Sequence, residues 1–220
     1  MICVMCARPL TTDFTLAALI SRAPLRLPTL CVRCEAQFER IDPASACPGC
    51  GRQAHPALCG DCQRWAAQGQ SLLQHRALFT YNEPMRQFIQ LYKGQGDRRR
   101  HTAFQHLMPL ARRGWALVPV TSEPHHFAAR GFDPVLDLFS HLQLSRWLRK
   151  ADTPLPQAQK DRAARLATPQ SFIATLPARP APHVLLLDDL YTTGRTLYHA
   201  QAALRAAGYG GTITSFSLIR

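Results

Sequence analysis

The sequence lacks any long hydrophobic run. Its longest apolar stretch, from Phe14 to Ile20, is interrupted by Thr15 and is far shorter than the roughly 18 residues that a membrane-spanning helix needs. The first residues of the sequence also have neither the positive charge nor the apolar segment of an export signal. We therefore predict a cytoplasmic protein with no membrane span.

Acidic residues are also scarce, at 14 Asp and Glu against 26 Lys and Arg, which gives a formal net charge of +12. Hydrophobic residues nevertheless make up 46% of the 220 residues and charged residues only 18%. This composition excludes a wholly disordered chain. The length suits one large domain or two small domains with a buried core.

No cysteine is left unpaired in the sequence. The eight cysteines form four Cys-x-x-Cys pairs, namely Cys3/Cys6, Cys31/Cys34, Cys47/Cys50 and Cys59/Cys62. This spacing lets two thiolates bind one tetrahedral metal, so two pairs complete a four-thiolate zinc site. A cytoplasmic chain disfavours disulfides, and the fourfold repeat disfavours redox pairs or ordinary buried thiols. We therefore predict two zinc ions.

The pairing of the four motifs stays open between a sequential and an interleaved arrangement. A four-thiolate site has no open coordination position, so both metals should be structural. Gly49 and Gly51 supply the open backbone that such a turn needs. We predict a double zinc ribbon over residues 1–70 and a second domain over 71–220. Because each site should serve its own small module, the change Cys47→Ser should unfold the second ribbon and leave the larger domain able to bind phosphate ligands.

The positive charge is unevenly distributed along the chain. Residues 1–70 contain 7 Arg and 5 acidic residues, whereas residues 71–220 contain 19 Lys and Arg against 9 acidic residues. Two Zn²⁺ on eight thiolates would add −4, which gives the first part a net charge of −2 and leaves +10 on the second. We therefore expect single-stranded DNA, if it binds, to bind mainly beyond residue 75.

From about residue 75, apolar strands alternate with amphipathic helices, which predicts an α/β domain with a parallel sheet. We expect strands over residues 77–81, 116–121, 184–187 and 212–219, and helices over residues 83–92, 101–113, 132–148 and 196–207. Several prolines between residues 152 and 182 predict long loops there.

The strongest chemical signal follows the expected strand at 184–187. Asp188 and Asp189 come directly after it, then a Thr-Thr-Gly turn leads into a helix. Ligands of parallel sheets bind at the carboxyl ends of the strands. The hydroxyls of Thr192, Thr193 and Thr196, with backbone amides at a helix N-terminus, suit a phosphate. The two carboxylates suit ribose hydroxyls or, through water, Mg²⁺. The segment therefore predicts a ribose 5-phosphate site.

Residues 184–196 resemble the phosphoribosyl pyrophosphate (PRPP) motif of type I phosphoribosyltransferases. With the four cysteine pairs, the whole chain resembles the ComF/GntX family of competence-associated proteins. Further family-like features are, in order, Tyr92-Lys93, Val118-Pro119, Arg130-Gly131-Phe132, Gln157, Arg165 and Phe172. The chain departs from the family at Asp133 and Thr168, where Asn is common.

The resemblance implies a type I phosphoribosyltransferase-like fold that binds PRPP with Mg²⁺. The residues concerned would be Asp188, Asp189 and Lys93 as catalytic groups, and Thr192, Thr193, Gly194, Arg195, Thr196 and Arg130 as ligand-binding groups. It also implies a role in handling single-stranded DNA during natural transformation or DNA utilisation, with a competence helicase or another DNA-processing protein as a partner. The alternative is an active phosphoribosyltransferase of nucleotide salvage, and the sequence does not separate the two.

Several other residues have two interpretations. Lys93 could hold the pyrophosphate or be a solvated helix end. Arg130 could bind a phosphate while Phe132 stacks on a base, or Phe132 could simply pack a hinge. Residues 98–101, Arg-Arg-Arg-His, could guide a single strand or form a solvated face. We interpret His55, which lies between two cysteine pairs, as a residue that does not bind the metal, because each site already has four cysteines.

Overall fold

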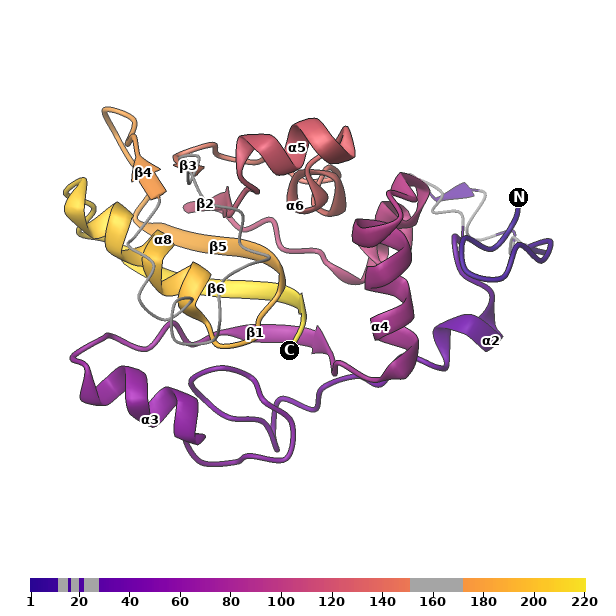
Figure 1. Ribbon diagram of the computed structural model, residues 1–220, viewed down its shortest axis with the longest axis horizontal. Helices are drawn as coiled ribbons and strands as arrows, with labels where there is room; N and C mark the ends of the chain where they lie inside the picture. Colours follow the sequence, from indigo (N-terminus) through magenta and orange to yellow (C-terminus); the bar gives the residue numbers. More distant parts are fainter. Residues whose placement is uncertain (12–15, 17–19, 22–27, 151–171) are drawn as a thin grey trace.

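The computed structural model describes the chain except for residues 12–15, 17–19, 22–27 and 151–171. Its centre is a sheet of four parallel strands in the order β1-β6-β5-β2 (Figure 1). These strands are β1 Arg76–Phe79, β2 Trp115–Pro119, β5 His183–Leu190 and β6 Thr212–Ile219. A two-stranded antiparallel sheet joins β3, Leu148–Lys150, to β4, Phe172–Ala174. The α/β class and the parallel sheet are confirmed.

The sheet has a core on each of its two faces, because side chains alternate along its strands. In β5, Val184 and Leu186 join one core cluster and Leu187 joins the other. Helix α8, Arg195–Ala206, packs on the first of these faces through Leu197 and Leu204 (Figure 1). Each face of the sheet therefore has its own core.

The remaining helices are short. They are α2 Val32–Glu35, α3 Gly60–Ala67, α4 Glu83–Ile89, α5 Pro124–Arg130 and α6 Pro134–Leu138, with the 3₁₀ turns η2 Arg98–Thr102 and η3 Gln105–Leu107. The side chain of Asn82 caps α4 by accepting a hydrogen bond from the Met85 amide at 3.1 Å. The helix continues as a π-helical turn, η1 Gln90–Gly94, which carries Lys93. The expected helix over 83–92 is thus confirmed, with a widened last turn.

The expected helix over residues 101–113 is wrong. The chain forms the two 3₁₀ turns η2 and η3, and no helix continues beyond Leu107 in this segment. Pro109 has no amide donor and obstructs a preceding helical turn. Phe104 and Met108 are buried instead in the core beside the sheet.

The expected helix over residues 132–148 is only partly right. Asp133 caps α6, because its Oδ1 accepts hydrogen bonds from the amides of Val135 at 2.9 Å and Leu136 at 3.0 Å. After α6 the chain turns back, and the Ser145 amide donates to the Leu117 carbonyl of β2 at 2.7 Å. Pairing with the sheet therefore replaces the second half of the expected helix. Most of the loops expected over 152–182 lie outside the described residues.

The two cysteine-bearing segments lie at different places around the sheet (Figure 1). The first ribbon, the described part of residues 1–41, lies beyond α4, and its Phe38 packs on Phe79 and Phe104. The second ribbon, residues 42–70, lies along β1, and its cysteines share a core cluster with Tyr191 and Tyr198. Each ribbon therefore packs into the core of one sheet face, which differs from the expectation of separate modules. The boundary at residue 70 stays a prediction.

Candidate ligand crevice and metal centres

The structure gathers the cysteines into two sequential groups. Sulfur atoms of Cys3, Cys6, Cys31 and Cys34 lie within 4.8 Å of one another, and so do those of Cys47, Cys50, Cys59 and Cys62. All eight are free thiols. The sequential pairing is therefore the arrangement in the structure. We call the groups the first and second cysteine clusters, and both are compatible with structural zinc.

The backbone around both clusters favours thiolates. The Cys31 amide donates to Cys3 Sγ, and the Cys59 amide donates to Cys47 Sγ, both at 3.4 Å. Burial raises the pKa of both thiols, but backbone amides outweigh it and lower the pKa of Cys3 to about 6 and that of Cys47 to about 7. A Cβ atom at Gly49 would lie 2.7 Å from Cys62 Sγ. Burial and the neighbouring thiols raise the pKa of Cys34 and Cys62, so each cluster favours deprotonation at one thiol and opposes it at another. A bound cation would offset that cost, since metal ligands must be deprotonated.

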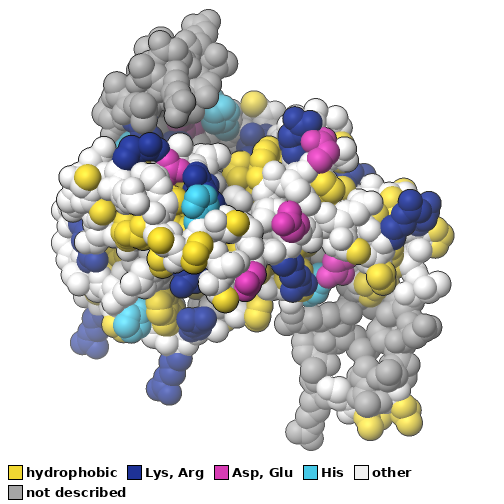
Figure 2. All heavy atoms as spheres, turned by 90° about the horizontal axis from the view of Figure 1, so that it is seen from below, with side chains coloured by type: hydrophobic (Ala, Val, Ile, Leu, Met, Phe, Trp, Pro, Cys, Tyr) yellow, Lys and Arg dark blue, Asp and Glu magenta, His cyan; other side chains and the backbone are white. Residues whose placement is uncertain are grey.

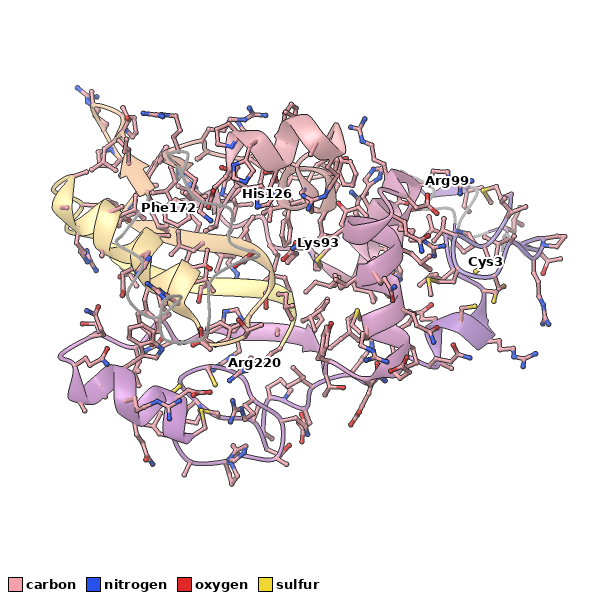
Figure 3. All side chains as sticks on the ribbon, in the orientation of Figure 1. Cys3, Lys93, Arg99, His126, Phe172 and Arg220 are labelled. Carbon is pink, nitrogen blue, oxygen red and sulfur yellow. The ribbon has the colours of Figure 1, made fainter. Side chains whose placement is uncertain are left out.

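The acidic pair lies at the carboxyl end of β5, next to a lysine. The Lys93 Nζ atom lies 2.7 Å from Asp189 Oδ2, and Asp189 is only 3% exposed. Burial lowers the pKa of Lys93, but the attraction of Asp189 outweighs it and raises that pKa. Figure 3 places Lys93 between the sheet and α4. The structure thus brings together two of the residues that the sequence singled out.

Asp188 differs from its neighbour. It is half-buried, and its Oδ1 accepts a hydrogen bond from the Asp189 amide at 2.9 Å. Burial and the adjacent charge of Asp189 raise its pKa to about 8. Without a bound cation, Asp188 therefore carries a proton at neutral pH.

The 192–196 turn joins this strand end to α8. Gly194 is the N-terminal cap of α8 and has a φ of +82°, which favours glycine. The side chains of Thr192, Thr193 and Thr196 are exposed. The turn thus presents three hydroxyls at the N-terminus of a 12-residue helix, where an anion is favoured.

Arg130 meets the same region from the end of α5. Its Nε donates to the Lys93 carbonyl at 3.0 Å. Its Nη1 is buried and has no hydrogen-bond partner among the described residues, and a buried unpaired donor is costly. An anionic ligand would supply the missing acceptor. Phe132 is buried, with its ring centroid 5.4 Å from that of Tyr92, which favours the interpretation that it packs a hinge.

The basic run at residues 98–101 is largely neutralised locally. Arg98 forms an ion pair with Asp137. Arg99 and Arg100 both pair with Asp97, at 2.9 Å and 3.2 Å. On the face in Figure 2, Lys and Arg side chains are scattered among uncharged groups. The ion pairs favour a solvated face over a dedicated strand-binding groove at residues 98–101.

The histidines add little to the site. His55 is exposed and belongs to neither cysteine cluster. His125 and His126 lie near Glu123, but Lys150 Nζ already contacts Glu123 Oε1 at 3.2 Å. Gln157, Arg165 and Thr168, which the resemblance singles out, lie outside the described residues.

Sequence reasoning missed two residues that contact the 192–196 turn. Trp65 donates from Nε1 to the Thr193 carbonyl at 2.9 Å, and Arg220 donates from Nη1 to the Thr192 carbonyl at 3.0 Å. Trp65 follows Cys62 closely and could have been noticed as an aromatic residue in a small metal module. No sequence motif surrounds Arg220, so nothing in the local sequence predicts its contact with Thr192.

No helix among the described residues is both long and apolar enough to cross a membrane.

The comparisons with known proteins agree with these features. No family model matches the chain. The chain is 32% identical over 228 residues to Competence protein ComFC of Streptococcus pneumoniae, an alignment that covers 99% of each chain. It is 30% identical over 236 residues to Competence protein ComFC of Bacillus subtilis, an alignment that covers 100% of this chain and 95% of the relative. On this similarity over nearly the full length of both relatives, the chain belongs to the ComF family.

Proposed function

We propose that the protein binds a 5-phosphoribosyl ligand, PRPP with Mg²⁺, at the carboxyl end of β5, and that it handles single-stranded DNA in a competence-associated role. The observation that carries the ligand proposal is the meeting of Asp188, Asp189 and Lys93 with the 192–196 turn at one strand end. This set offers acceptors for ribose hydroxyls, a cation for pyrophosphate and a helix N-terminus for the 5-phosphate.

Each residue has a defined task in this proposal. Asp188 and Asp189 would accept hydrogen bonds from the ribose hydroxyls, and bound Mg²⁺ would neutralise the pyrophosphate charge. The Lys93 ammonium, now on Asp189, would move to the pyrophosphate and leave the carboxylate to the ribose. Arg130 Nη1 would gain an acceptor in place of its present lack of one.

The competence role is supported by the relatives, both of which are named competence proteins. The +10 charge of residues 71–220 supports an electrostatic contribution to strand binding. We propose the two cysteine clusters as the ligands of two structural zinc ions.

An active phosphoribosyltransferase of nucleotide salvage is the second candidate. The placement of Lys93 beside the acidic pair favours it, because a leaving pyrophosphate needs a nearby cation. A base nitrogen would bond to the anomeric carbon while the bond from that carbon to pyrophosphate oxygen breaks. Pyrophosphate would leave with the electron pair, and the acceptor proton would pass to solvent.

Titration calorimetry with PRPP and Mg²⁺ tests the binding proposal. Wild-type protein should bind, and the double change Asp188→Asn with Asp189→Asn should abolish binding without unfolding the protein. Thr193→Val should weaken binding about 10- to 100-fold, since it removes a hydroxyl donor to a charged phosphate. If the double variant binds PRPP as tightly as wild type, the segment is only a strand-to-helix connection. Pyrophosphate release over a panel of bases decides between the two candidates.

A further inference from the structure

We propose that the second ribbon positions the 192–196 turn, and that Trp65 and Arg220 are the positioning residues that connect them. The ligand part of this proposal rests on the proposed function, whereas the physical connection between ribbon and turn does not. The argument follows from three contacts that converge on the turn from one side.

Trp65 makes the first contact from α3, the helix that begins directly after Cys59. Its indole Nε1 donates to the Thr193 carbonyl at 2.9 Å. The same ring stacks on Tyr198 in α8, with ring centroids 4.3 Å apart and planes 27° from parallel. One side chain of the ribbon therefore holds both the turn and the helix that the turn begins.

Arg220 makes the second contact from the residue after β6. Its Nη1 donates to the Thr192 carbonyl at 3.0 Å, and its Nη2 donates to Cys50 Sγ at 3.2 Å. Its guanidinium lies over the Tyr191 ring, 4.6 Å from the centroid. A planar guanidinium can bond in two directions and stack at once, which a lysine ammonium cannot do. Arg220, which Figure 3 places between the sheet and the second ribbon, thus connects a cysteine of the second cluster to the turn.

Tyr191 and Gly194 make the third contact. A Cβ atom at Gly194 would overlap the Tyr191 hydroxyl, so the backbone of the turn lies directly against the ring that Arg220 covers. From Cys50 to Gly194 the contacts are continuous, through the Arg220 guanidinium and the Tyr191 ring. Such a chain of packed groups can transmit a change in the ribbon to the turn.

These contacts reach the backbone of the turn and not its side chains. They hold the carbonyl groups of Thr192 and Thr193, whereas the side chains of both threonines stay exposed. The ribbon therefore fixes the backbone of the turn and leaves its hydroxyls available to a phosphate. A turn ordered before binding lowers the entropic cost of binding. Loss of these contacts should weaken the ligand even where the fold survives.

Two conservative variants of the full-length, zinc-loaded protein test the proposal. Trp65→Phe keeps an aromatic ring against Tyr198 but removes the indole donor. Arg220→Lys keeps the charge but removes the fork that reaches both Cys50 and Thr192. Trp115→Phe is the matched control, because Trp115 stacks on His183 at the start of β5, away from the turn.

Hydrogen exchange of the amides in residues 191–197 is measured without ligand, and the affinity for PRPP with Mg²⁺ is measured by calorimetry. Both test variants should exchange faster in the turn and bind about 3- to 10-fold more weakly, an effect of the size that one hydrogen bond typically contributes. Trp115→Phe should change neither quantity.

The two proposals fail in different ways. If wild-type protein does not bind PRPP, the proposed function falls, and the exchange measurement alone still decides whether the ribbon positions the turn. If exchange in the turn is the same in wild type, Trp65→Phe and Arg220→Lys, the positioning proposal is overturned. Faster exchange throughout the molecule in both variants would also overturn it, because that result indicates general destabilisation.

Discussion

The two cysteine clusters have the same motif and the same number of thiols, yet they lie in different surroundings. In the first cluster Cys6 is exposed and Cys31 is half-buried. In the second cluster all four cysteines are at most 3% exposed, and Cys50 accepts a hydrogen bond from Arg220. The first ribbon contacts the segment after Lys93, where Thr29 donates to the Ala103 carbonyl at 3.2 Å. The second ribbon contacts the 192–196 turn itself.

This difference shows that a cysteine motif does not by itself determine which part of the fold its metal supports. The Cys-x-x-Cys spacing determines that a metal can be held, but the neighbours of the cluster determine what depends on that metal. Arg100, whose Nη1 lies 2.9 Å from Met5 Sδ, links the first ribbon to the chain beyond Lys93. Trp65 links the second ribbon to Thr193. Loss of each metal should therefore have a different consequence.

The largest expected effect is from Cys47→Ser. Loss of one ligand in a buried four-thiolate site should release the metal and cost several kcal/mol of folding free energy. We now expect PRPP binding to be lost as well, in contrast to the expectation that each module stands alone. Elemental analysis should find about two zinc ions per chain in wild type and about one in the variant. Cys6→Ser, at the exposed cysteine of the first cluster, should keep the affinity within about threefold of wild type, a change of less than 1 kcal/mol.

If folded Cys47→Ser protein bound PRPP as tightly as wild type, the two clusters would not differ in their effect on the ligand site.

The next effect is at Gly194. Gly194→Ala places a Cβ against the Tyr191 hydroxyl and forces a positive φ on a non-glycine residue. Gly208, at the other end of α8, has a φ of +88°, but a Cβ atom there would meet open space. Gly208→Ala should therefore impose only the backbone strain of a positive φ, roughly 1–2 kcal/mol. Thermal melts and calorimetry should show that both changes destabilise, whereas only Gly194→Ala weakens PRPP, by more than about 10-fold. Equal PRPP affinity in the two variants would contradict the close contact of the turn with Tyr191.

A smaller effect is expected from the protonation of Asp188. Its pKa is raised to about 8 in the folded protein, so the native state holds a proton that the unfolded state has released by neutral pH. Stability should therefore fall as pH rises from about 4 to about 8, because the native state binds more protons than the unfolded state in that range. In zinc-loaded protein without Mg²⁺, the midpoint of thermal unfolding should fall by a few degrees. Asp188→Asn should remove this fall, and an unchanged pH profile in that variant would contradict the assignment.

The smallest effect concerns single-stranded DNA. Arg112 and Arg113 are exposed in the strongly basic part of the chain, and Arg8 and Arg33 are exposed in the first ribbon. The double change to Gln at 112 and 113 should lower the slope of log affinity against log salt by up to about 1.4. The same double change at 8 and 33 should lower it less. A larger loss from the ribbon pair would contradict the charge argument.

The sequence predicted those parts of the molecule that local pattern determines. The strand expected over 212–219 coincides with β6, because its β-branched, aromatic and aliphatic residues, interspersed with small Ser and Thr, favour a strand. The motif spacing also predicted two metal clusters, although it left their pairing open. The helix expected over 101–113 failed because burial of Phe104 and Met108 mattered more than the periodicity.

The contacts that define the candidate site depend on tertiary packing, which the sequence alone could not supply. Lys93 was singled out, but its ion pair with Asp189 joins the π-helical turn after α4 to the end of β5, and no local pattern predicts that contact. Arg220 lies 170 positions from Cys50, and no local pattern relates two such residues. Its contacts with Cys50 and Thr192 exist only because the fold brings the second ribbon, the chain end after β6 and the 192–196 turn together.

The most direct test of the account is the rate at which a zinc-selective chelator removes each metal, with and without PRPP and Mg²⁺. Since coupling between two sites is reciprocal, a ligand on the 192–196 turn should slow release from the second cluster and leave the first unchanged. Release of the two metals should give two kinetic phases. The Cys6→Ser variant should lack the first metal, so the phase that is missing in this variant belongs to the first cluster. The account predicts that PRPP slows only the remaining phase. If PRPP binds and slows both phases equally, or neither, the second ribbon does not support the turn.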